Sequence, residues 1–126
     1  MNLDLPLQEN IFSDVAENAA KKIAGEATST KNKSTQLRKF YDELVMWHDK
    51  LFDHNVKDKE ATYKELAPFI KMMCAKIAYA KGRGHVSDGF EKLFSDVIKA
   101  IKNPTTLKHA KLFVEAFMGF YKAEGK

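Results

Sequence analysis

Cysteine, proline, glycine and arginine are all scarce in this chain of 126 residues. It has one cysteine, three prolines, six glycines and two arginines. The lone Cys74 excludes an internal disulfide and a cysteine-based zinc site, and a reducing, cytoplasmic setting is the simplest interpretation. No segment approaches the ~18 consecutive apolar residues of a membrane span. The first ten residues also lack the basic and then apolar pattern of a secretory signal.

Apolar content, in contrast, is ample. Hydrophobic residues make up 44% of the chain and aromatic residues 11%, against 30% charged residues. This balance excludes a chain that is disordered as a whole. The length favours one domain over residues 1–126. Within it, we expect an acidic N-terminal helix at 8–24, a loop at 25–34 and a basic helical part at 35–126.

Charge is unevenly distributed along the chain. Residues 1–30 hold two lysines against five carboxylates, a net charge of −3, whereas residues 31–126 hold 19 basic against 12 acidic groups, a net charge of +7. A basic domain favours a polyanionic partner. The alternative is an ordinary lysine-rich surface.

Apolar residues recur at helical spacing almost everywhere, which predicts an all-α bundle of about five helices. Ser34 is a plausible N-cap for the second helix, and Ser87 or Asp88 for the fourth. Pro68 either kinks the third helix or marks its start, and Gly82 is placed to end that helix in a left-handed conformation. The predicted helices cover roughly 8–24, 35–53, 59–81, 88–102 and 105–123. The predicted core face of the third comprises Leu66, Phe69, Ile70, Met73, Ile77 and Ala80.

No constellation for catalysis is visible. The four histidines are not spaced to place two ligands on one helical turn, and Cys74 has no histidine three or four residues away. Gly82 and Gly84 follow a predicted helix and not a strand, which excludes a phosphate cradle of the dinucleotide or P-loop kind. We therefore expect no catalytic residue, no metal ligand and no cofactor.

A second stripe runs along the third predicted helix. Met72, Lys76, Tyr79 and Arg83 follow one another at spacings of four, three and four, which places them on one line. Cations beside an aromatic ring suit RNA or DNA, because the cations meet phosphates and the ring stacks or packs on sugar. The alternative is that Met72 and Tyr79 form the edge of the core.

A basic cluster surrounds the start of the second predicted helix, where free N–H groups and the helix dipole favour an anion. Both arginines of the chain lie in these two clusters, and arginine is the better bidentate phosphate ligand. A solvated helix start is the alternative, with Arg38 pairing with Asp42 one turn away. The cluster comprises Lys31, Lys33, Arg38 and Lys39. A third group, Lys108, Lys111 and Lys122, is expected to be an ordinary solvent face.

Three segments, in this order and separation, resemble the small subunit of type III-A CRISPR effector complexes, the Csm small-subunit family. They are STQLRKFY at 34–41, IAYAKGR at 77–83, and FVEAF at 113–117 continuing through Tyr121-Lys122. The resemblance covers roughly residues 33–124. The acidic helix at 8–24 lies outside it.

The resemblance implies a small all-helical protein without catalytic activity that acts in antiviral defence. Several copies would stack in a ribonucleoprotein, facing the guide RNA paired to its target RNA and contacting mostly the backbone. Its partners would be CRISPR RNA, target RNA, other subunits of the complex and copies of itself, while nuclease and cyclase activities belong to other subunits. The residues carried over by the motifs are Arg38, Lys39, Tyr79, Lys81 and Arg83. Lys76 is added from the stripe alone.

Two other functions stay open at this point. A helical protein–protein adaptor without nucleic-acid binding is favoured by Met46, which lies opposite the core face of the second helix. A DNA-binding helix-turn-helix is disfavoured, because the loop after that helix is too long and lacks a tight glycine turn.

Phe113 and Phe120 widen the apolar stripe of the last helix, and we expect one of them to contact another chain.

Overall fold

The computed structural model describes residues 1–126 and contains helices and no strands, which confirms the all-α prediction. The π-helical turn continues directly into α1, and α3 and α4 form one rod interrupted at Met72, so the chain makes five rods. In order, the elements are η1 (Ile11–Val15), α1 (Ala16–Gly25), α2 (Ser34–Leu51), α3 (Lys59–Lys71), α4 (Met73–Gly82), α5 (Asp88–Ala100) and α6 (Pro104–Ala123).

Local sequence signals set several helix ends. The Ser87 side chain accepts a hydrogen bond from the Phe90 N–H at 3.2 Å, and it therefore caps α5 as predicted. Pro68 lies inside α3, and the interruption at Met72 comes one turn after it. Of the two alternatives for Pro68, the structure therefore shows a break within a rod and not a helix start.

Two predicted caps were wrong. Ser34 is already the first residue of α2, and Lys33 occupies the cap position without a side-chain hydrogen bond. At the end of α4 the left-handed residue is Gly84, with φ of 77°, and not Gly82. The N–H of Gly84 donates to the Lys81 carbonyl and that of His85 to the Ala80 carbonyl, each at 2.9 Å. This is the Schellman arrangement, and it places the glycine two residues later than the sequence pattern indicated.

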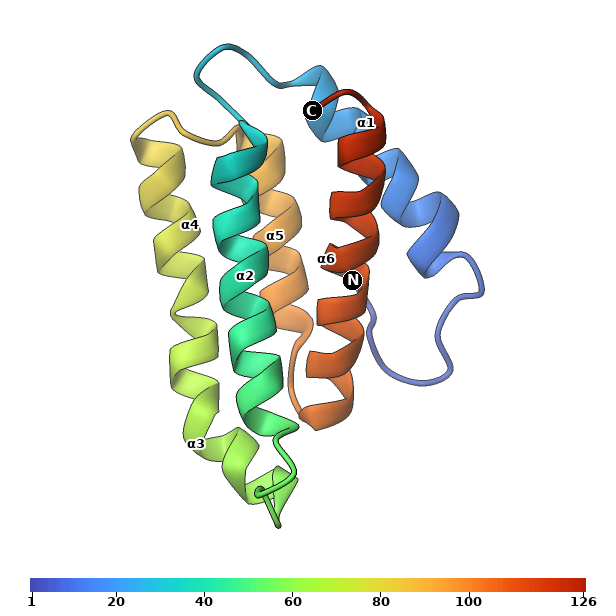
Figure 1. Cartoon of the computed structure of the whole chain (residues 1–126), viewed down its shortest axis with the longest axis vertical. Helices are drawn as coiled ribbons and strands as arrows, with labels where there is room; N and C mark the ends of the chain where they lie inside the picture. The colour runs from blue at the N-terminus through green and yellow to red at the C-terminus, as the bar shows by residue number, and fades with distance from the viewer.

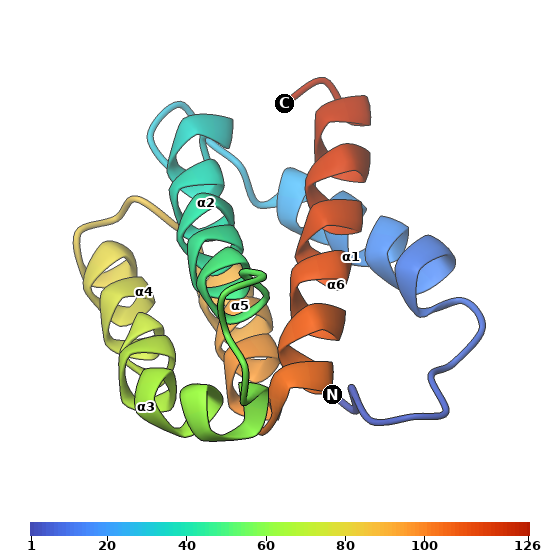
Figure 2. The same ribbon diagram turned by 60° about the horizontal axis from the view of Figure 1, so that its bottom comes forward.

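The rods pack around one hydrophobic core of 26 buried residues. Figures 1 and 2 show α2 flanked by α4 and α6, with α5 behind it, and α1 crossing α6 on the side away from α4. Aromatic rings fill the centre: Phe40 lies 5.6 Å from Phe94 between ring centroids, and Phe117 lies 5.6 Å from Tyr121. Burial of this apolar surface is the main favourable term in folding.

The predicted core face of the α3–α4 rod was wrong at one position. Phe69 is 55% exposed, whereas Tyr63, Ile70 and Ile77 are buried. Phe69 immediately precedes Ile70, and adjacent residues are displaced by about 100° around a helix, which turns the Phe69 ring to the flank of the rod. There it stacks on Trp47 of α2, with ring centroids 6.0 Å apart.

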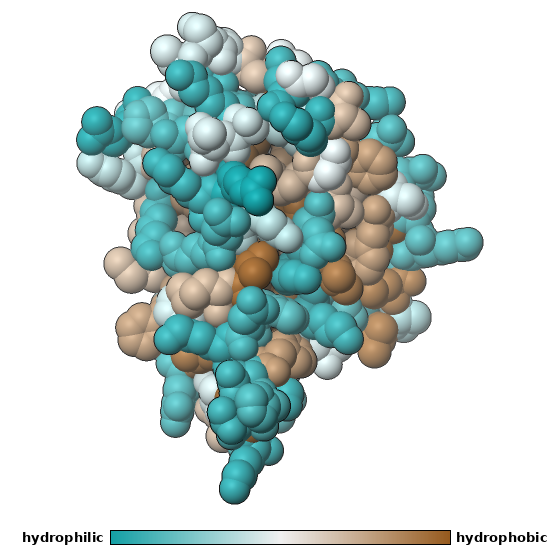
Figure 3. Space-filling model, viewed as in Figure 1, coloured by the Kyte–Doolittle hydropathy of each residue, from teal (hydrophilic) through white to brown (hydrophobic).

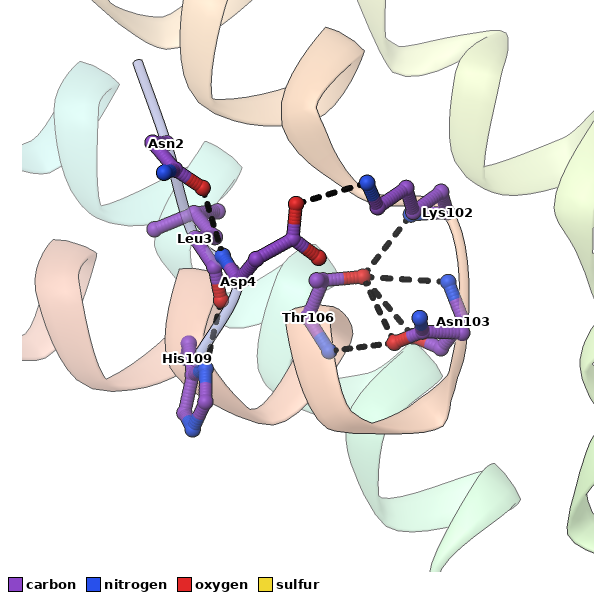
Figure 4. Close-up of polar contacts among 7 residues, drawn as sticks. All are labelled: Asn2, Leu3, Asp4, Lys102, Asn103, Thr106 and His109. Atoms are coloured by element: carbon purple, nitrogen blue, oxygen red, sulfur yellow. Dashed lines mark hydrogen bonds and ion pairs between the residues drawn. The ribbon is translucent and has the colours of Figure 1, made fainter. Parts of the chain in front are cut away.

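The first residues of the chain are anchored on α6 (Figure 4). Leu3 is 1% exposed, and its carbonyl oxygen accepts a hydrogen bond at 2.7 Å from Nδ1 of the buried His109. Asp4 pairs with Lys102 at 2.6 Å, just before the start of α6. The N-terminal segment therefore contributes to the core although it precedes the first helix.

Candidate nucleic-acid interface

The loop between α1 and α2 is fixed by one buried side chain, that of Asn32. Asn32 is 1% exposed and has φ of 58°, in the left-handed region that asparagine tolerates better than most residues. Its amide donates to the Ile23 carbonyl at 3.3 Å and to Ser87 Oγ at 2.8 Å, and its Oδ1 accepts from the Ser87 N–H at 2.8 Å. The segment predicted as a simple loop is therefore tied to the end of α1 and the start of α5.

The backbone of Asn32 completes this junction. Its N–H donates to the His85 carbonyl at 3.0 Å, and its carbonyl accepts from the Tyr121 hydroxyl. Asn32 follows Lys31 of the first basic cluster directly, and His85 lies two residues after Arg83 of the second. These hydrogen bonds join segments 53 or more residues apart and bring the two predicted basic clusters to the same end of the bundle.

This end of the molecule is rich in cations. Figure 1 shows that α2 begins, and α4 and α6 end, at the same end of the bundle, and Figure 3 shows hydrophilic side chains covering the start of α2. All seven of these cations are exposed to solvent. The set comprises Lys31, Lys33, Arg38, Lys39, Lys81, Arg83 and Lys122, and we name it the basic end.

A surface hollow of about 310 Å³ lies between the start of α2 and the end of α6. The Arg38 side chain, which is 70% exposed, borders it, with Asp42 3.9 Å away as a loose ion-pair partner. Lys122, which is exposed as expected, borders the same hollow and therefore lies beside Arg38. The sequence could not indicate this, because the two residues meet only through the packing of α2 on α6. The lining residues are Ser34, Thr35, Arg38, Met118, Tyr121 and Lys122.

The predicted stripe on the α3–α4 rod is accessible, as expected. Met72 is 56% exposed and Tyr79 58% exposed. The Arg83 guanidinium carbon lies 5.7 Å from the centroid of the Tyr79 ring, and Arg83 Nη1 donates to the Tyr79 hydroxyl at 3.1 Å. Ring and guanidinium therefore form one preassembled unit at the end of α4.

The remaining predicted site residues differ in how free their charges are. Lys76 donates to both carboxylate oxygens of Glu43 at 3.0 Å and so links α4 to α2. Lys81 pairs with Asp88 at 3.4 Å. Lys39 and Arg83 make no ion pair. A phosphate would therefore meet an uncompensated charge at Lys39 and Arg83, but would compete with a carboxylate at Lys76 and Lys81.

The arrangement suits an extended polyanion. Exposed cations and hydroxyl groups at one end can each meet a backbone phosphate, and such contacts fix position without reading bases. No three histidine, cysteine, aspartate or glutamate side chains come together as a metal-binding group. None of the helices combines the length and the apolar character that a membrane span requires.

A family comparison bears directly on this geometry. The model of the family described as Csm2 Type III-A matches residues 11–126. The chain belongs to the Csm2 Type III-A family. It is therefore a small subunit of a type III-A CRISPR complex and associates with that complex.

The Csm2 Type III-A match extends further than the resemblance seen in the sequence motifs. It includes η1 and α1, which the motifs left out, and it leaves only residues 1–10 outside. The packing of α1 against α6 agrees with this wider boundary. No curated protein and no solved structure matches the chain.

The ionisation of Tyr121 makes the free energy of unfolding depend on pH. Burial raises the pKa of its phenol above the ordinary value of about 10. Because the pKa of this phenol is higher in the folded than in the unfolded chain, its contribution to stability is complete below about pH 10. That contribution is lost as the pH rises further. Tyr121→Phe should cost about 1 kcal/mol of unfolding free energy at neutral pH, because the Asn32 carbonyl loses its donor.

Urea unfolding of both proteins between about pH 7 and about pH 11 checks this expectation. The stability difference between wild type and Tyr121→Phe should shrink above about pH 10, because only the wild type has a phenol to ionise at this position. A stability difference that stays constant across this pH range would show that folding does not raise the pKa of Tyr121.

Proposed function

We propose that this chain is an RNA-binding, non-catalytic subunit that holds the guide RNA–target RNA duplex of its type III-A complex through backbone contacts. The observation that supports this most is the basic end, where two clusters separated in sequence meet through Asn32. RNA-contacting residues proposed there are Arg38, Lys39, Tyr79, Lys81, Arg83 and Lys122. Lys76 is proposed as a weaker contact, because Glu43 already engages its ammonium group.

Such binding should depend little on RNA sequence. In RNA-guided complexes, base pairing with the guide reads the sequence, and the protein holds the geometry and the phosphates. Surface cations at the start of one helix and the ends of two others suit that task. We assign no chemical step to this subunit.

A specific observation favours the adaptor as a second candidate. Phe69 and Met72 are more than half exposed, and Met46 is 38% exposed. With Trp47, which stacks on Phe69, they provide apolar surface on α2, on α3 and at the interruption before α4, of the kind that protein partners cover. A pure adaptor would use this surface and leave the basic end unoccupied.

Binding to RNA of mixed sequence at increasing salt distinguishes the two functions. For the RNA-binding subunit we expect a mobility shift at low salt. The logarithm of the binding constant should fall linearly with the logarithm of the salt concentration, with a slope of about −0.7 to −0.9 for each phosphate contacted. A mobility shift that does not respond to salt, or no binding even at low salt, would contradict RNA binding and favour the adaptor.

Contact between copies of the subunit is part of the same proposal. Phe113 is 1% exposed within its own chain, so it cannot be the residue that contacts a neighbour. Phe120 is only partly buried, and Figure 3 shows apolar atoms gathered over the side formed by α6 and α1. We therefore assign the expected contact with another chain to Phe120.

A further inference from the structure

The Tyr79 ring is too exposed for a structural role alone. It lies in the last turn of α4, on the side opposite the buried Met73 and Ile77, and 58% of the residue is exposed with Arg83 in place. A tyrosine that only completes the core buries its ring, as Tyr63 does at 6% exposure. The Tyr79 ring therefore remains accessible for a ligand.

Arg83 holds this ring in a defined position. Its guanidinium lies over the ring, and its Nη1 donates to the hydroxyl at 3.1 Å, so a contact over the ring and a hydrogen bond at its end restrain one side chain. Arg83 itself caps α4 just before the fixed turn at Gly84. A ring that is already oriented loses less conformational freedom when a flat ligand stacks on it.

The charges around the ring indicate the class of ligand. Arg83 pairs with no carboxylate, so its remaining N–H groups are free to donate to an anion. A flat apolar group with an anion close by is the chemistry of a nucleotide, and aromatic side chains beside cations are the usual platforms for single-stranded nucleic acid. Bases inside a duplex stack on each other and offer no free face to a protein ring.

We propose that Tyr79 and Arg83 form a stacking platform for one unpaired base of the bound RNA, with Arg83 also contacting the adjacent phosphate. This rests on the proposed RNA-binding function and adds a preference for RNA that contains an unpaired nucleotide. The basic end would hold paired and unpaired RNA alike, whereas the platform would engage only the unpaired base.

The test compares a fully paired RNA duplex with the same duplex carrying one bulged 2-aminopurine, using the full-length protein. We expect quenching of the 2-aminopurine fluorescence and about tenfold tighter binding of the bulged duplex. Tyr79→Leu should abolish both effects, so that the bulged duplex binds no more tightly than the paired one. Tyr79→Phe keeps the ring and should retain both. Phe69→Leu removes another exposed ring, on α3, and serves as the matched control that retains both.

Each other outcome contradicts the platform. If the wild type binds both duplexes equally, with no quenching, the platform is wrong while RNA binding stands. If neither duplex binds, the proposed function fails with it. If Tyr79→Leu leaves the RNA measurements unchanged and instead weakens binding to another protein of the complex, Tyr79 is part of a protein interface.

Discussion

Replacing Arg38 and Arg83 together by alanine is expected to weaken binding to guide RNA paired with its target by roughly 100-fold. A charge-assisted hydrogen bond contributes about 1.5 kcal/mol, which is about tenfold in affinity for each arginine. The salt slope should become shallower by about one unit for each lost phosphate contact. The loss should be similar for RNAs of unrelated sequence, because phosphates carry no sequence information.

A charge-matched control distinguishes a local contact from a general loss of positive charge. Lys57 and Lys64 are exposed, form no ion pair and lie toward the opposite end of the bundle, in the loop before α3 and in α3. Lys57→Ala with Lys64→Ala removes the same charge and should change affinity much less. If both double variants weaken binding equally, the RNA surface is misplaced.

Replacing Asp42 distinguishes an Arg38 that contacts RNA from an Arg38 that only pairs within its own helix. The Arg38–Asp42 pair is exposed and spans 3.9 Å, so its contribution to stability is small. Asp42→Asn should therefore leave stability nearly unchanged and slightly strengthen RNA binding, because a competing carboxylate is removed. A loss of stability in Asp42→Asn, with RNA affinity unchanged by Arg38→Ala, would identify a purely structural pair.

Asn32→Ala is expected to lower the free energy of unfolding by roughly 3 kcal/mol, because it leaves the buried Ser87 N–H without an acceptor and forces alanine into a left-handed conformation. Asn32→Gly loses the same side-chain hydrogen bonds, but glycine adopts the left-handed conformation without strain. It should therefore lower the free energy of unfolding by about 1 kcal/mol less than Asn32→Ala does. Urea unfolding of the two variants measures both contributions.

Asn32→Ala also tests whether the junction at Asn32 holds the basic end in place. Because the Asn32 side chain ties the loop to Ser87, its removal should loosen the loop that carries Lys31 and Lys33, although the backbone hydrogen bond to His85 is kept. A control at Thr30, an exposed residue of the same loop, should leave stability nearly unchanged on Thr30→Ala. If Asn32→Ala is as stable as Thr30→Ala, the junction does not hold the basic end together.

The sequence was sufficient for the helices because their signals are local. Apolar spacing located all five rods, and Ser87 was one of the two adjacent residues predicted to cap the fourth helix. Errors arose where a neighbour in space decides the outcome. Phe69 is as apolar as a core residue, but its ring faces Trp47 on the flank. The turn at Gly84 was misplaced because two glycines, Gly82 and Gly84, compete for the same cap.

The candidate site was predictable only in parts. The stripe with Tyr79 and Arg83 lies on one helix, so its spacing was enough to predict an accessible edge. Lys122 joined Arg38 through the packing of α6 on α2, which no local pattern encodes. Asn32 was missed for a different reason: a polar residue in a polar loop has the composition of an exposed segment, and only the structure shows that it is buried.

The most direct measurement for the central claim is photo-cross-linking of RNA to this subunit within the type III-A complex purified from the cell that makes it. The account predicts that CRISPR RNA copurifies with the subunit and that cross-linked peptides fall within residues 31–39, 79–85 and 118–126. Cross-links confined to α1 or to the loop before α3, or a purified complex in which this subunit touches no RNA, would contradict it.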